Sequence, residues 1–189
     1  MVSLKKEFLK DWHRLPNLTT GARLIMSPLP GALLIIDPAD ATYRWVAAIL
    51  FIIVVATDAL DGYLARSRNE VTTLGKLFDP LVDKVLIILT LLALCFVNPL
   101  IWVPTIIIIM REVTVTAWRA RAKKRGLVIA ASRSGKVKMV TQSVAIALLL
   151  LPMSLDEGIW ESITVVAVIV AVYMTIVSWV EYYSKFSER

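Results

Sequence analysis

Four aspartates stand close together in the sequence, where one apolar run ends and the next begins. Asp58 and Asp61 are three residues apart and Asp79 and Asp83 are four apart, so a helix would place each pair on one face. Two short helices joined by a loop would then gather four carboxylates, which requires a counter-ion. Carboxylate oxygens suit Mg²⁺, Mn²⁺ or Ca²⁺, and no His or Cys lies nearby to favour zinc. The spacing predicts a divalent-metal site, against the alternative that the acids merely end a membrane helix.

Small residues and one arginine accompany the acids. Gly62 and Ala65 follow Asp61, and Gly75 precedes the second acidic pair. Each leaves room for a ligand to approach the backbone. Arg66 lies about one helical turn beyond Asp61 and presents a planar guanidinium that suits a phosphate. Carboxylates, a divalent cation, an arginine and close backbone approach together predict a diphosphate site.

The complete spacing from Asp58 is D-x2-D-G-x2-A-R-x8-G-x3-D-x3-D, which matches the signature of the CDP-alcohol phosphotransferase family at all eight positions. The resemblance implies an integral membrane enzyme of six transmembrane helices, usually a homodimer, with its active site facing the cytoplasm. It implies that Asp58, Asp61 and Asp79 hold Mg²⁺ or Mn²⁺, and that Asp83 is the general base and a further metal ligand. The residues implied to contact the CDP-linked donor are Gly62, Ala65, Arg66 and Gly75, with Thr57, just outside the signature, as a further polar contact.

Charged residues in the later apolar runs indicate the acceptor. Arg111 and Glu112 interrupt the stretch TIIIIMREVTVTAW, and charged groups within a span face the protein interior or a wet cavity. Arg133, Lys136 and Lys138 stand at or beside the entry to the fifth run. These basic residues predict a cationic pocket for an anionic acceptor, formed by Arg111, Lys136 and Lys138 with Arg133 behind them. The alternatives are an Arg–Glu pair that only ties helices together and basic side chains that meet anionic lipid head groups.

Three further stretches resemble one branch of the family, the phosphatidylglycerophosphate synthases. They are REVTVTAWRARAKKRG followed by GKVK, the acidic variant DPLVDK, and PNLTTGAR, which fits P-N-x-x-T-x-x-R. The last stretch adds Asn17, Thr20 and Arg23 as polar groups near the donor. This branch implies transfer of a phosphatidyl group from CDP-diacylglycerol to glycerol 3-phosphate, giving phosphatidylglycerol phosphate and CMP.

Other functions remain as alternatives. Within the family, a cardiolipin synthase of the CDP-alcohol type and an inositol-phosphate-using relative also take anionic acceptors. From other classes, the chain would be a small transporter or a non-catalytic membrane protein that binds divalent cations. Such proteins would carry polar groups deep in several spans, whereas in this sequence the polar groups gather near one face of the predicted membrane. No nucleic-acid partner is expected.

The composition places these residues in a bilayer. The 189 residues are 58% hydrophobic and the mean hydropathy is +0.72, whereas soluble domains have about 45–50% apolar residues. Since a span needs about 20 mostly apolar residues, the sequence predicts an all-α integral membrane protein with six transmembrane helices. Pro28 and Pro30 interrupt the first run, and Asn98-Pro99 is a turn that divides the third from the fourth. The predicted runs are Gly21–Ile36, Tyr43–Asp61, Leu81–Val97, Leu100–Arg119, Val137–Leu155 and Trp160–Tyr182.

The placement of charge predicts the orientation. The lysines and arginines gather on one side of the predicted membrane, with Arg44 on the other. The positive-inside rule puts that side, with both termini, in the cytoplasm. Residues 1–15 carry apolar and basic side chains at helical spacing, which is typical of a juxtamembrane amphipathic helix. With no linker, repeat or signal peptide in view, residues 1–189 are predicted to form one domain in a bacterial cytoplasmic membrane. Cys95 is the single cysteine, so no disulfide within the chain is expected.

Overall fold

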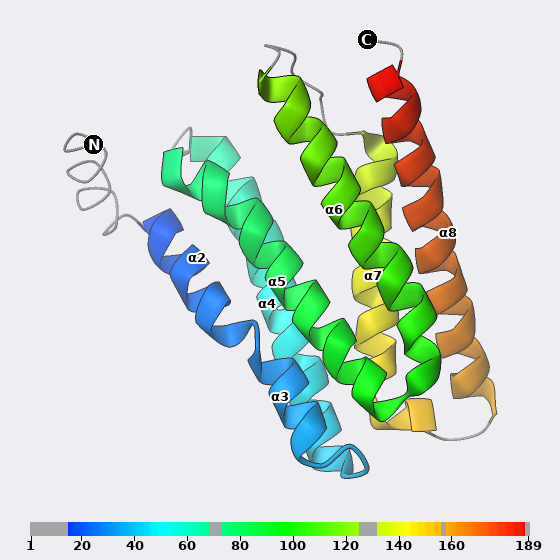
Figure 1. Cartoon of the computed structure of the whole chain (residues 1–189). Helices are drawn as coiled ribbons and strands as arrows, with labels where there is room; N and C mark the ends of the chain where they lie inside the picture. Colours follow the sequence, from blue (N-terminus) through cyan, green and yellow to red (C-terminus); the bar gives the residue numbers. More distant parts are fainter. Residues whose placement is uncertain (1–14, 69–72, 125–131, 156–157, 188–189) are drawn as a thin grey trace. The chain divides into compact units, whose positions relative to one another are not determined.

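The computed structural model describes residues 15–68, 73–124, 132–155 and 158–187, so the predicted arm lies almost wholly outside it. Within these ranges the side chains of residues 15–20, 59, 61–68, 73–81, 83, 123–124, 155 and 185 are also outside the description. Every regular element in the described ranges is helical (Figure 1), as predicted. The elements are α2 (Leu15–Met26), α3 (Leu29–Ile36), α4 (Ala41–Arg68), α5 (Thr73–Val97), the 3₁₀ helix η1 (Pro99–Ile101), α6 (Trp102–Lys124), α7 (Arg133–Leu150), the 3₁₀ helix η2 (Pro152–Leu155) and α8 (Ile159–Ser187).

The chain forms two compact units, Met1–Ala93 and Leu94–Arg189. The first unit contains α2, α3, α4 and most of α5. The second contains the end of α5, followed by α6, α7 and α8 and their connections. In the second unit α8 packs against both α6 and α7.

The first apolar run is a broken helix because of its prolines. A proline lacks the backbone N–H of a helix interior and fixes its own φ. Helix α2 ends as the Ser27 N–H donates to the Arg23 carbonyl at 2.8 Å, and Pro28 is the N-cap of α3. Gly31 lets α3 approach α5, since a Cβ there would stand 3.0 Å from the Ala93 Cβ and 3.2 Å from the Leu89 carbonyl oxygen.

Helix α4 carries two of the four predicted metal ligands, Asp58 and Asp61, in its C-terminal part. It begins after Asp40, whose carboxylate accepts hydrogen bonds from the backbone N–H groups of Thr42 (2.7 Å) and Tyr43 (3.1 Å). These bonds lower the pKa of Asp40. The helix then runs 28 residues to Arg68, about 42 Å at the usual rise. A bilayer core is only about 30 Å thick, so the stretch from Asp58 to Arg68 prolongs a long helix instead of forming the short separate helix we expected.

Three helical stretches in the described part of the chain are long and apolar enough to cross a membrane. Two others are apolar but shorter. Large apolar side chains such as Phe96, Val103 and Ile169 are exposed, which suits contact with lipid. The fold is therefore that of a membrane protein. The long stretches are Ala41–Asp58, Pro99–Ala122 and Ile159–Ser184, and the short ones are Gly21–Ile36 and Lys84–Val97.

Turn and cap residues set the ends of the helices in the second unit. Asn98 accepts a hydrogen bond from the Leu100 N–H at 3.0 Å, and η1 follows it, so the predicted division at Asn98-Pro99 is confirmed. Ser132 is the N-cap of α7 and accepts from the Gly135 N–H at 3.2 Å. This cap starts α7 with Arg133, so that Lys136 and Lys138 both lie within its first two turns.

Candidate active site

The four predicted metal ligands occupy two helices of the first unit. Asp58 and Asp61 lie in α4, and Asp79 and Asp83 lie in α5. Because both segments are helical, each pair shares a helix face, as the spacing predicted. Of the four side chains the structure describes only that of Asp58. Whether the carboxylates meet therefore stays a prediction.

Asp58 has a partner from the preceding part of the chain. Arg23 of α2 donates from Nη1 to Asp58 Oδ1. The Arg23 side chain is buried, whereas that of Asp58 keeps 27% of its surface exposed. The structure thus brings together a residue predicted to bind the donor and one predicted to bind metal.

The other predicted donor residues give little further geometry. Thr57 donates its hydroxyl to the Ile53 carbonyl at 2.7 Å, so this hydroxyl bonds to the backbone of α4 itself. The remaining side chains lie outside the described ones. They are Asn17, Thr20, Gly62, Ala65, Arg66 and Gly75.

The donor set of the acids suits a hard divalent cation. Two carboxylate pairs on helix faces supply only oxygen ligands, which Mg²⁺ and Mn²⁺ prefer. Among the described side chains no group of three or more His, Cys, Asp or Glu residues is placed to hold a metal. Asp58 is the one predicted ligand among those described side chains. The fit of the four aspartates to a metal therefore rests on their residue type and on their spacing along α4 and α5.

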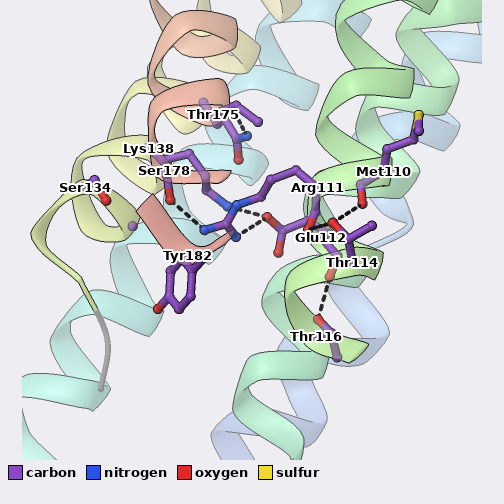
Figure 2. Close-up of polar contacts among 12 residues, drawn as sticks. Met110, Arg111, Glu112, Thr114, Thr116, Ser134, Lys138, Thr175, Ser178 and Tyr182 are labelled. Atoms are coloured by element: carbon purple, nitrogen blue, oxygen red, sulfur yellow. Dashed lines mark hydrogen bonds and ion pairs between the residues drawn. The ribbon is translucent and has the colours of Figure 1, made fainter. Parts of the chain in front are cut away.

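The second unit contains a buried ionic cluster. Glu112 of α6 accepts at Oε1 from Arg111 Nη1 at 2.8 Å and from Lys138 Nζ of α7 (Figure 2). The exposed fractions of these three residues are 5% for Arg111, 8% for Glu112 and 5% for Lys138. Two cations share one carboxylate, so the trio carries an excess positive charge. Both cations were predicted from the sequence as acceptor residues, whereas Glu112 was predicted only as a partner of Arg111.

Helix α8 supplies a second layer of contacts to this cluster. Arg111 Nη2 donates to Ser178 Oγ at 2.6 Å, and the Arg111 Cζ lies 5.4 Å from the centre of the Tyr182 ring. Arg119 lies over the same ring at 4.8 Å and donates to the Tyr182 hydroxyl. Ser134 of α7 donates to Glu181. Figure 2 shows Ser178 and Tyr182 beside Arg111.

The contribution of α8 was missed at the sequence level, where no residue of the run Trp160–Tyr182 was assigned a role. Thr175, Ser178 and Tyr182 are all buried. They recur at three- and four-residue spacing in an apolar run, which places them on one helix face. That spacing of polar residues was the available signal.

The predicted acceptor residues divide into two groups. Arg111 and Lys138 meet around Glu112, whereas Arg133 and Lys136 are exposed on the first turns of α7. Within the described part of the chain, no hydrogen bond or ion pair joins either of these exposed residues to the cluster. Arg111 and Glu112 link α6 to α8 and α7, as the alternative interpretation of this pair expected, and the predicted acceptor residue Lys138 takes part in the link. Whether these cations bind an acceptor stays a prediction.

Comparison with known proteins gives consistent matches. A family model described as CDP-alcohol phosphatidyltransferase matches residues 13–177. A Bacillus subtilis protein named CDP-diacylglycerol–glycerol-3-phosphate 3-phosphatidyltransferase is 39% identical over 182 residues, which cover 90% of this chain and 94% of that protein. A Mycobacterium tuberculosis protein named probable phosphatidylglycerophosphate synthase is 37% identical, covering 90% and 80% of the two chains. A Rickettsia felis protein with the same name as the Bacillus one is 32% identical, covering 89% and 93%.

Proposed function

Because this chain belongs to the CDP-alcohol phosphatidyltransferase family, as its motifs predicted, we propose that it transfers a phosphatidyl group from CDP-diacylglycerol to glycerol 3-phosphate. The products are phosphatidylglycerol phosphate and CMP. The relatives that are named for this activity match the chain over about nine-tenths of its length. The structural observation that carries the proposal is the buried cluster of Arg111, Glu112 and Lys138. Its excess positive charge suits the phosphate of an anionic acceptor.

The first unit binds the donor in this proposal. A divalent cation, Mg²⁺ or Mn²⁺, would be held by Asp58, Asp61, Asp79 and Asp83, and when bound it would neutralise charge on the diphosphate. Arg23 orients Asp58, with which it is paired in the structure. The position of Asp58 at the end of the apolar stretch Ala41–Asp58 supports a site at the membrane edge. The other donor contacts are those predicted from the motif, namely Arg66, Gly62, Ala65, Gly75, Asn17, Thr20 and Thr57.

The chemistry is a direct displacement at phosphorus. Asp83 accepts the proton of an acceptor hydroxyl, and the oxygen forms a bond to the phosphorus that carries the lipid. The bond between that phosphorus and the CMP oxygen breaks, and CMP leaves. Arg111 and Lys138 hold the acceptor phosphate, and Lys136 and Arg133 attract it from the surface. No covalent intermediate is required.

Charge placement and the apolar helices together support the proposed topology. We propose six spans, both termini and the active site on the cytoplasmic side of a bacterial membrane, and one family domain that includes both units. The family match over residues 13–177 takes in most of each unit. The relatives named above come from bacteria. A homodimer is proposed from the family resemblance.

The test is CMP release by purified protein in detergent with CDP-diacylglycerol and Mg²⁺. Glycerol 3-phosphate, phosphatidylglycerol and inositol phosphate are compared as acceptors, and Asp83→Asn is the control. Release that depends on glycerol 3-phosphate and is lost in the variant supports the proposal. Release with phosphatidylglycerol or inositol phosphate would instead identify a cardiolipin synthase or an inositol-phosphate-using enzyme. A folded protein that releases no CMP with any acceptor would contradict the enzymatic reading.

A further inference from the structure

We infer that Ser178 and Tyr182 of α8 are positioning residues that hold Arg111 in the orientation needed to bind the acceptor phosphate. This inference rests on the proposed function, and it assigns a role to a helix that the motifs left without one. Both residues lie beyond residue 177, where the family match ends. They are therefore not implied by the family signature.

The first step concerns the guanidinium of Arg111. A guanidinium has five N–H donors in a fixed fork. Arg111 uses one on Glu112 and one on Ser178, at 2.8 Å and 2.6 Å. Its Nε, although buried, has no hydrogen-bond partner among the residues that the structure describes. The two bonds hold the fork from both terminal nitrogens and leave its Nε edge for another acceptor.

The second step concerns what holds the fork in place. A single hydrogen bond to Glu112 would leave the guanidinium free to rotate about that contact. Glu112 is also shared with Lys138, so it does not serve Arg111 alone. Ser178 supplies the second fixed point, and its side chain is fully buried. Such a bond to a charged group is stronger than one between neutral groups. Ser178 thus selects one orientation of Arg111.

The third step concerns the Tyr182 ring, which is almost fully buried and contacts two arginines. Arg111 and Arg119 lie 5.4 and 4.8 Å from its centre. Both distances are within the range of cation–π attraction. The ring therefore gives each of these two like charges a favourable contact in the interior of the unit. This arrangement keeps positive charge near the acceptor site while fixing the position of each cation.

The experiment measures KM for each substrate in Ser178→Ala, Ser178→Thr, Tyr182→Phe and Tyr182→Leu. Ser178→Ala is expected to raise the KM for glycerol 3-phosphate about tenfold, the size expected for a lost bond to a charged group. The KM for CDP-diacylglycerol should stay unchanged, and Ser178→Thr should restore the wild-type value. Tyr182→Leu should act like Ser178→Ala, while Tyr182→Phe, which keeps the ring, should have a smaller effect.

Thr175→Val is the matched control, because Thr175 lies one turn earlier on the same buried face. Its hydroxyl accepts from Gln142 Nε2 at 2.8 Å and donates to the Ala171 carbonyl at 2.6 Å, and neither of these partners belongs to the cluster. A purely structural role for this face predicts that all these variants lose stability or activity alike. An equal rise of the glycerol 3-phosphate KM in Thr175→Val, or an unchanged KM in Ser178→Ala, overturns the inference.

A second measurement separates this inference from the proposed function. Thermal unfolding is followed with and without inorganic phosphate, which needs no turnover. Phosphate should stabilise wild type and Thr175→Val, and stabilise Ser178→Ala much less. If wild type uses a different phosphorylated acceptor, the proposed function fails, and positioning is judged by the KM for that acceptor. If wild type neither turns over nor is stabilised by phosphate, both proposals are overturned.

Discussion

The two units of the chain hold their charges in contrasting ways. In the first unit Asp58 keeps 27% of its side-chain surface exposed and is paired with Arg23, and the other acids follow within a short stretch of sequence. In the second unit Arg111, Glu112 and Lys138 are almost completely buried and are supported from a third helix. A partly exposed carboxylate can exchange partners with an incoming cation, whereas a buried cluster must be assembled by the fold itself. We infer that ligands complete the donor half, while packing builds the acceptor half in advance.

The largest expected effect comes from removing one charge in the first unit. Asp58→Asn keeps the shape of the side chain but loses a metal-binding charge, and CMP release should fall at least about a thousandfold. Charge stabilisation by a bound metal is worth several kcal/mol, and each 1.4 kcal/mol is about tenfold in rate. Asp40→Asn at the other end of α4 is the control, because asparagine is as good an N-cap as aspartate. Full activity in Asp58→Asn would contradict the proposal that Asp58 of the first unit binds a metal ion needed for the reaction.

The next effect tests whether the cluster of the second unit is built by the fold. Glu112→Gln leaves Arg111 and Lys138 buried without their shared counter-ion. Removing one partner of a buried ion pair costs about 3–5 kcal/mol, so the variant should unfold about 10 °C below wild type. Glu161→Gln, on the exposed first turn of α8, should unfold at the wild-type temperature. A Glu112→Gln protein as stable as wild type would mean that packing, and not this carboxylate, holds the two cations.

A smaller effect sharpens the division of substrates between the units. Lysine keeps the charge of arginine but lacks its planar fork. Arg23→Lys should therefore raise the KM for CDP-diacylglycerol about tenfold, and Arg111→Lys should raise the KM for glycerol 3-phosphate by a similar factor. Steady-state kinetics with each substrate varied in turn measures both. If each variant raised both constants equally, the donor and acceptor halves would not be separate.

The same contrast explains what the sequence could and could not predict. In the first unit the motif residues lie on two consecutive helices, so linear spacing determines which side chains share a face. The break at Pro28 and the turn at Asn98-Pro99 were also predictable, because proline acts locally. The length of α4 was not, since helix propagation through Asp58 to Arg68 depends on the residues beyond the apolar run.

The second unit was less predictable because its cluster joins helices far apart in the sequence. Arg111 and Ser178 are separated by 67 positions, and Lys138 and Glu112 by 26. Charge in an apolar run identified Arg111, but no local pattern shows that one carboxylate serves two cations. Serine and tyrosine are also common in membrane helices without any polar partner. Only packing of α8 against α6 and α7 gives Ser178 and Tyr182 their role.

The smallest expected effect concerns the exposed start of α4, far along that helix from Asp58. Asp40 accepts hydrogen bonds from the Thr42 and Tyr43 N–H groups, which lower its pKa. A lowered folded-state pKa means that the charged form contributes stability above the unfolded-state value of about 3.9, and that this contribution is lost as the pH falls through the folded-state pKa. Asp40→Ala should slightly lower the unfolding temperature at pH 7 with both KM values unchanged. Asp40→Asn, which cannot titrate, should match wild type at pH 7 and lose less stability than wild type below about pH 4. An acid response identical in wild type and Asp40→Asn would show that this cap does not depend on its charge, and the charges of α4 that matter would then be those of the predicted metal ligands Asp58 and Asp61.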